Sequence, residues 1–175
     1  MMMTTLKRRS LLLGGTALGA IAAIPAMQWL GAAIAGEGEG PVPGTFEITR
    51  TDEEWRRILG DDAYYVMRMQ GTERPFTSAL LDEHREGIFH CAGCDLPLFD
   101  AATKYDSGTG WPSFYQPLDN AVGELVDNSL GMTRTEIHCR RCGGHLGHVF
   151  NDGPAPTGLR YCMDGIALKF VPKAA

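Results

Sequence analysis

The stretches Cys91-Ala92-Gly93-Cys94 and Cys139-Arg140-Arg141-Cys142 decide the fold of this chain. Both have the C-x-x-C spacing, and 138 − 94 = 44 residues lie between them. Each tight turn points two sulfurs at one ion, and two such turns complete a tetrahedral thiolate cage with metal–sulfur distances of about 2.3 Å. We therefore predict one structural Zn²⁺ per chain, held by Cys91, Cys94, Cys139 and Cys142. Two disulfides, or one redox-active C-x-x-C pair, are the alternatives.

The fifth cysteine, Cys162, has no C-x-x-C partner. Arg160 precedes it by two residues, so in a strand both side chains would share a face and the guanidinium would favour the thiolate. His145 and His148 precede a turn at 151–153, which would fold their strand back beside Cys162 and bring an imidazole within proton-transfer reach. This pattern predicts a nucleophilic thiol. An inert core cysteine, with histidines that only support the metal site, is the alternative.

The first 35 residues differ in composition from the rest of the chain. Lys7, Arg8 and Arg9 precede residues 11–35, which carry no charge. This pattern is typical of a twin-arginine export signal, and Ala33-Ile34-Ala35 offers the small residues that a signal peptidase reads. A retained membrane anchor is the alternative, because 25 apolar residues can span a bilayer. Either interpretation places the folded domain outside the cytoplasm, in the periplasm or cell envelope.

Residues 36–45 are rich in Gly and Pro and predict a flexible linker, so that 46–175 form one folded domain. Without residues 1–35, which hold three of the 16 basic residues and no acid, the net charge is 13 − 21 = −8. An acidic domain is poorly suited to phosphate backbones, which argues against nucleic-acid binding.

The periodicity of the domain predicts a mainly β fold. Thr51 and Glu54 have the spacing of a capping box, which predicts a helix over 52–59. A second helix is expected from about Asp61 or Asp62 to Met69, burying Tyr65 and Met69. Short apolar runs separated by turn residues then predict antiparallel strands. These runs lie at 88–90, 96–99, 122–126, 133–137, 148–150, 159–162 and 166–170.

Several separated motifs resemble those of one known family. They are Ser107–Phe114 (SGTGWPSF), Gly144–Phe150 (GHLGHVF), Arg160-Tyr161-Cys162 and the two C-x-x-C pairs. Together they resemble the peptide-methionine (R)-S-oxide reductases, the MsrB family, over residues 47–172. The resemblance implies a twisted antiparallel sheet called a β-tent, with structural zinc and one or two short N-terminal helices. It implies that 46–175 form a catalytic domain that reduces the R epimer of methionine sulfoxide, free or in proteins.

The resemblance also implies roles for individual residues. Cys162 matches the nucleophile, which becomes a sulfenic acid as methionine leaves. Trp111 and Phe150 match an aromatic pocket for the methyl group of the substrate, although either could be a plain core residue. The positions that surround the sulfoxide oxygen and tune the thiol are His145, His148, Asp152, Arg160 and Asp164.

Two residues depart from the family pattern. Thr109 stands where many members have a cysteine that resolves the sulfenic acid, so an external thiol, from a thioredoxin-like or other reductant, is expected to recycle Cys162. Alternatively, a cysteine of the C-x-x-C pairs resolves it and zinc is absent. Asp164 stands where the family usually has Asn. A carboxyl group there could raise the pKa of the thiol, or stay neutral and donate a hydrogen bond.

We expect a monomer whose substrate is methionine R-sulfoxide. A second function class is a non-catalytic, zinc-stabilised β-tent that binds a ligand in a cage of Trp111, Phe114 and Phe150. Such a cage would not need Cys162 beside two histidines, which favours the enzyme.

Overall fold

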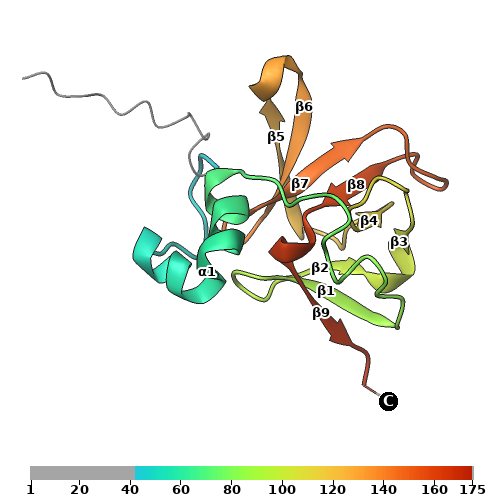
Figure 1. The fold of residues 1–175 in the computed structure, drawn as a ribbon, viewed down its shortest axis with the longest axis horizontal. Helices are drawn as coiled ribbons and strands as arrows, with labels where there is room; N and C mark the ends of the chain where they lie inside the picture. The colour runs from blue at the N-terminus through green and yellow to red at the C-terminus, as the bar shows by residue number, and fades with distance from the viewer. Residues whose placement is uncertain (1–41, 175) are drawn as a thin grey trace, which may run out of the picture. The chain divides into compact units, whose positions relative to one another are not determined.

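Two antiparallel sheets and one N-terminal helix make up residues 42–174, the part of the chain that the computed structural model describes (Figure 1). The mainly β fold class is thereby confirmed. The predicted signal over 1–35 lies outside the described residues, as does most of the predicted linker. Within 42–174, no helix combines the length and the apolar character needed to cross a membrane.

The helix α1 (Asp52–Met69) begins with the predicted capping box, in which Thr51 and Glu54 bond each other's backbone N–H. It is divided at Gly60, whose φ of 74° lies outside the helical region, so two helical segments follow one another as predicted. The expected burial of Tyr65 was wrong: this side chain is 58% exposed. The face of the second segment that packs against β7 and η3 carries Tyr64, Val66 and Met67, which leaves Tyr65 on the solvent side.

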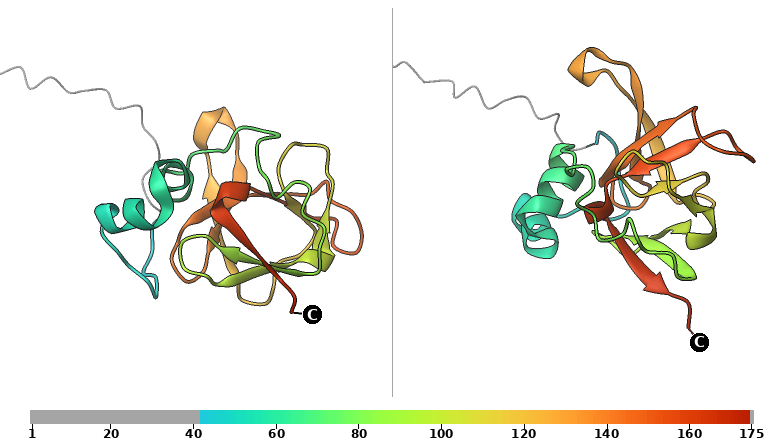
Figure 2. Two further views of the ribbon diagram at one scale, coloured as in Figure 1. Left: turned by 60° about the horizontal axis from the view of Figure 1, so that its bottom comes forward. Right: turned by 45° about the vertical axis from the view of Figure 1, so that its right-hand side comes forward.

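The first sheet has the strand order β2 (Pro97–Asp100), β1 (Gly87–Cys91), β9 (Leu168–Pro172). The second has the order β3 (Lys104–Tyr105), β4 (Ser113–Phe114), β8 (Arg160–Met163), β7 (His145–Phe150), β6 (Arg134–Cys139), β5 (Val122–Asp127). Short 3-10 turns connect some of them: η1 (Ala101–Thr103), η2 (Ser129–Gly131) and η3 (Gly165–Ala167). All seven predicted strands are present, and the helix α1 lies to one side, against β7 and η3 (Figure 2).

An aromatic core fills the space between the two sheets. Phe114 of β4 stacks on Phe99 of β2 with ring centroids 4.4 Å apart, and Phe89 of β1 meets it edge-on at 5.0 Å. All three side chains are fully buried, and burying each contributes about 1.5–3 kcal/mol. The core therefore holds the three-stranded sheet against the six-stranded one.

The strand β8 lies between β4 and β7, and it carries Cys162 into the middle of the larger sheet. In the antiparallel registers, Cys162 is paired with Ser113 of β4 and with His148 of β7. Gly147 allows β7 to approach closely: its φ is +144°, and a Cβ there would collide with the carbonyl oxygen of Cys162. The backbone thus fixes the neighbours of the thiol before any side chain is considered.

Candidate active site and metal centre

The four cysteines of the two C-x-x-C pairs converge on one point. Their Sγ atoms all lie within 4.8 Å of one another. The distance is 3.7 Å between Cys91 and Cys142 and 3.5 Å between Cys94 and Cys139. Four sulfurs about 2.3 Å from a tetrahedral ion would be about 3.8 Å apart, whereas disulfide sulfurs are about 2.05 Å apart. The cluster is therefore compatible with one structural metal ion, and none of these cysteines is in a disulfide.

This cluster joins the two sheets. Cys91 ends β1 in the three-stranded sheet, while Cys139 ends β6 in the six-stranded one. Hydrogen bonds among the sulfurs raise the pKa of Cys91 and lower the pKa of Cys94, because closely packed sulfurs compete for protons. A cation at the centre would allow all four to ionise, and its bonds would then tie both sheets together.

Cys162 lies apart from this cluster and is half-buried. Its Sγ is 3.7 Å from the Thr109 hydroxyl. Burial raises the pKa of the thiol, and the Asp164 charge raises it further. The Thr109 hydrogen bond and the Arg160 charge lower the pKa, but by less than burial raises it. The expected effect of Arg160 is thus present but is outweighed by desolvation, so the free thiol is mainly protonated at neutral pH.

The hairpin of β7 and β8 brings Phe150, Asp152 and Arg160 together. Nε and one terminal nitrogen of Arg160 donate to the two carboxylate oxygens of Asp152, at 2.8 and 2.9 Å. The guanidinium carbon also lies 4.4 Å from the centroid of the Phe150 ring. Arg160 lowers the pKa of Asp152, so the pair is ionic. A two-point ion pair and a ring contact fix the plane of this guanidinium two residues from the thiol.

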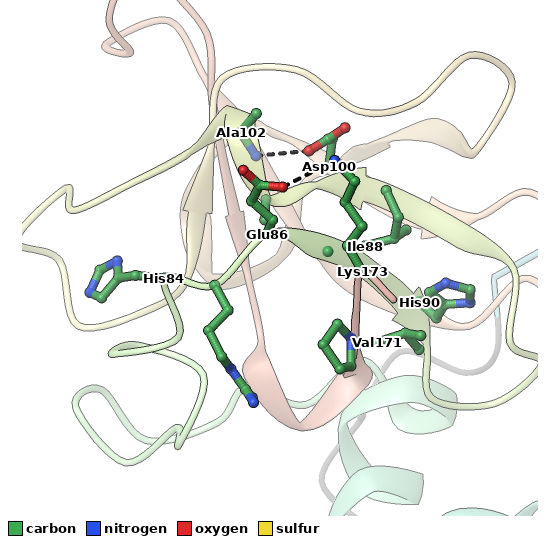
Figure 3. Close-up of a pocket in the computed structure, with 12 residues that line it drawn as sticks. His84, Glu86, Ile88, His90, Asp100, Ala102, Val171 and Lys173 are labelled. Atoms are coloured by element: carbon green, nitrogen blue, oxygen red, sulfur yellow. Dashed lines mark hydrogen bonds and ion pairs between the residues drawn. The ribbon is translucent and has the colours of Figure 1, made fainter. Parts of the chain in front are cut away.

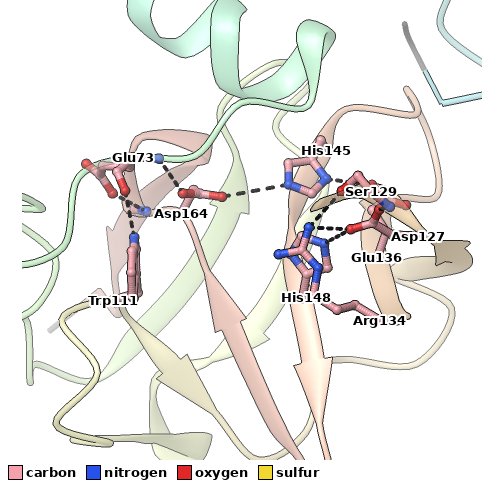
Figure 4. Close-up of polar contacts among 10 residues, drawn as sticks. Glu73, Trp111, Asp127, Ser129, Arg134, Glu136, His145, His148 and Asp164 are labelled. Atoms are coloured by element: carbon pink, nitrogen blue, oxygen red, sulfur yellow. Dashed lines mark hydrogen bonds and ion pairs between the residues drawn. The ribbon is translucent and has the colours of Figure 1, made fainter. Parts of the chain in front are cut away.

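His148 faces an ionised carboxylate. Its Nε2 is 2.8 Å from Oδ2 of Asp127, and Asp127 also accepts from Ser129 and Arg134 (Figure 4). Burial alone would raise the pKa of Asp127, but these hydrogen bonds and the Arg134 charge outweigh it and lower the pKa. Nε2 of His148 therefore carries the proton, and Nδ1 is the basic nitrogen. Burial lowers the pKa of His148, so the ring is neutral near pH 7.

His145 is 1% exposed and lies between two carboxyl groups (Figure 4). Its Nδ1 is 2.7 Å from Glu136, whose other oxygen is 3.0 Å from Nδ1 of His138. The two imidazoles lower the pKa of Glu136 against the effect of burial. Nε2 of His145 has no hydrogen-bond partner among the described residues and lies 3.8 Å from Oδ2 of Asp164. The rings of His145 and His148 are 5.3 Å apart, so the structure brings the predicted histidines together.

Asp164 is buried beside His145 and is linked to Trp111 through Glu73. Oδ1 of Asp164 accepts from the backbone N–H of Glu73 at 2.7 Å, and the Glu73 carbonyl accepts from Nε1 of Trp111 at 2.9 Å. Burial raises the pKa of Asp164 to about 6. Trp111 is therefore anchored at one edge of the site. Trp111 does not form a ring pair with Phe150 among the aromatic contacts of the described residues. Phe114 is fully buried, so it cannot line the alternative ligand cage.

Three site residues were missed from the sequence: Glu73, Asp127 and Glu136. Glu136 left a weak signal, because it is an acidic residue on a strand that is otherwise largely buried. Asp127 precedes Ser129 with the spacing of an Asx turn, which explains its turn but not its bond to His148. Glu73 left no signal, because it bonds Asp164 and Trp111 through its backbone N–H and carbonyl, which almost any residue could supply.

A pocket of ≈ 570 Å³ lies beside β1 and β9 (Figure 3). Its described lining includes His84, His90 and Asp100 but no predicted site residue.

Asp164→Asn should stabilise the protein at high pH. The raised pKa means that Asp164 favours folding while protonated, below about pH 4, and that this contribution is lost as pH rises through about 6. This rise of about two units in the pKa of Asp164 corresponds to roughly 3 kcal/mol of folding free energy. Urea unfolding of the metal-loaded variant should therefore show a gain of about 1 kcal/mol near pH 4.5 and of up to roughly 3 kcal/mol at pH 8. The exposed Asp119→Asn is the control, and an equal gain at both pH values would contradict the buried acid.

Comparison with known proteins places this geometry in a family. The SelR domain matches residues 59–172. Over 128 residues, the chain is 56% identical to the peptide methionine sulfoxide reductase MsrB of Pseudomonas putida strain GB-1, covering 73% of this chain and 98% of that protein. It is 53% identical over 126 residues to the protein of the same name from Leptospira interrogans, covering 71% and 96%. The chain belongs to the SelR-domain family of peptide methionine sulfoxide reductases, MsrB.

Proposed function

We propose that this protein reduces the R epimer of methionine sulfoxide to methionine and that Cys162 is its nucleophile. The position of Cys162 carries the proposal: it lies outside the four-sulfur cluster, opposite His148 and beside Arg160. Membership of the family supplies the reaction class. The substrate is methionine sulfoxide, free or within a polypeptide.

The first step oxidises Cys162. Its thiolate attacks the sulfoxide sulfur, the oxygen is protonated, and the thiol and sulfoxide become a sulfenic acid and methionine. The cysteine sulfur loses two electrons and the sulfoxide sulfur gains two. The thiol proton ends on the transferred oxygen, so atoms and charge balance.

Neutral His148 is the proposed proton carrier. Its Nδ1 accepts the proton of the Cys162 thiol and returns it to the sulfoxide oxygen, while ionised Asp127 holds Nε2. The Arg160 guanidinium, oriented by Asp152, stabilises negative charge on the sulfur and on the oxygen. Trp111 and Phe150 provide the apolar wall for the substrate methyl group, which selects the epimer.

Recycling of Cys162 requires an external reductant. Thr109, whose hydroxyl is 3.7 Å from the sulfur, has no thiol, and the other four cysteines belong to the four-sulfur cluster. One external thiol attacks the sulfenic acid and releases water, and a second thiol frees Cys162 as an external disulfide forms. A thioredoxin-like protein or a small thiol fits this role.

We also propose that the metal is Zn²⁺, because four thiolates in a closed tetrahedral set are the ligands of structural zinc.

The N-terminal sequence further supports export by the twin-arginine route, with cleavage after Ala35. N-terminal sequencing of protein from the cell envelope should begin at Gly36, and an intact Met1 would indicate an anchor instead.

The metal-loaded domain should reduce the R epimer with dithiothreitol as the electron source and leave the S epimer unchanged. Cys162→Ser should lower this rate by at least about 10³-fold, because no other described thiol faces the site. Chromatography of the methionine released from each epimer measures both effects. Reduction of the S epimer, or full activity of Cys162→Ser, would refute the proposal.

Zinc content should separate the two kinds of cysteine. We expect one zinc per chain in the native protein and in Cys162→Ser, but little in Cys91→Ser, whose serine leaves the cage one thiolate short. Cys91→Ser should also unfold at a markedly lower temperature. Elemental analysis and thermal melts measure these properties, and metal-free native protein with full stability would count against the structural role.

A further inference from the structure

A chain of three hydroxyl groups leads from the Cys162 sulfur into the protein. The Thr109 hydroxyl oxygen is 3.7 Å from Sγ, and the Ser107 hydroxyl is 2.8 Å from that of Thr109. Ser107 is in turn 2.7 Å from the hydroxyl of Ser113, which lies 3.1 Å from the carbonyl oxygen of Trp111. Ser113 is fully buried, so its hydroxyl depends on these protein partners.

The chain has two consistent directions. Each hydroxyl has one proton to donate and can also accept, whereas the carbonyl of Trp111 can only accept. When Cys162 is a thiol, S–H donates to Thr109, and each hydroxyl donates to the next until Ser113 donates to the carbonyl. When Cys162 is a thiolate, Ser113 donates to Ser107, Ser107 to Thr109, and Thr109 to the sulfur.

The far end of the chain rules out a role as a proton wire. A proton passed inward from the thiol would have to stay on the carbonyl oxygen of Trp111, which is a very weak base. The proton therefore leaves Cys162 by another path, and the hydroxyls only rotate. Rotation about three C–O bonds moves no heavy atom, so the chain suits both states of the sulfur.

We propose that Thr109, Ser107 and Ser113 form a hydroxyl chain that ends on the Cys162 sulfur and reverses direction when the thiol ionises. The proposal deepens the proposed function, since it rests on Cys162 as the nucleophile. The Thr109–Cys162 bond is weak while sulfur is the donor and charge-assisted once sulfur is the anion. Thr109 and Ser107 are thus positioning residues that favour the thiolate in a half-buried site.

Other groups act on the same sulfur and remain in place when the chain is cut. Burial and the Asp164 charge disfavour the thiolate, while the Arg160 charge favours it. Tyr105 also lies near enough to feel the thiolate charge, and His148 faces Cys162 from β7. Substitutions confined to hydroxyls change none of these charges, so a shift in the pKa of Cys162 reports on the chain.

The test is the pKa of the Cys162 thiol in metal-loaded protein, taken from the pH dependence of alkylation by iodoacetamide. Peptide mass spectrometry separates Cys162 from the metal-site cysteines. Thr109→Val should raise this pKa by about one unit, because it removes a hydrogen bond to a charged group. Thr109→Ser keeps the hydroxyl and should leave the pKa near the native value. Thr103→Val, which removes a hydroxyl bonded to the Asp100 carbonyl, is the matched control.

Ser107→Ala decides whether the hydroxyls act as a chain. It should raise the pKa by about 0.3 unit, since one bond strengthens the next by about 10–30%. In the Thr109→Val background it should add nothing, because its effect passes through Thr109. Equal effects in both backgrounds, or no effect of either substitution, would overturn the chain. If the variants show these pKa shifts but the native protein reduces neither sulfoxide epimer, the proposed function is refuted and the hydroxyl chain stands.

Discussion

The antiparallel pairing of β8 with both β4 and β7 is the constraint on which the site depends. One register places Cys162 opposite His148, and the other places it opposite Ser113. A shift of one residue would turn the thiol to the other face and separate it from both neighbours. The strand β8 carries Arg160 two residues before the thiol, and Asp164 directly follows the strand. Five residues of backbone thus carry two of the charged groups that act on the sulfur.

The four-sulfur cluster and the lone thiol occupy separate places in the fold. The cluster lies at the ends of β1 and β6, and a metal ion held by its four sulfurs would link the two sheets and have no ligand position for a substrate. Cys162 is left as the sulfur free to react, and Thr109 beside it offers a hydroxyl in place of a second thiol. The proposed redox chemistry at Cys162 therefore need not disturb a metal ion held by the cluster.

Sequence patterns predicted what depends on local periodicity and spacing. The C-x-x-C pairs predicted the cluster, and the alternation of apolar runs predicted seven strands. The two-residue strands β3 and β4 were too short to leave a pattern. The burial of Tyr65 was wrong because residue spacing does not specify which face of the second helical segment packs against β7 and η3. Glu136 and Asp127 reach their histidines only through the register of β5, β6 and β7, which side-chain periodicity does not specify. The carboxyl partners of His145 and His148 could therefore be found only from the tertiary structure.

The most direct measurement is a single turnover without reductant. Metal-loaded protein is mixed with one equivalent of methionine R-sulfoxide, trapped with a reagent for sulfenic acids, and mapped by peptide mass spectrometry. We expect one label, on Cys162, with one methionine formed and the metal retained. A disulfide within the four-sulfur cluster, metal release, or methionine formed with Cys162 unmodified would contradict it.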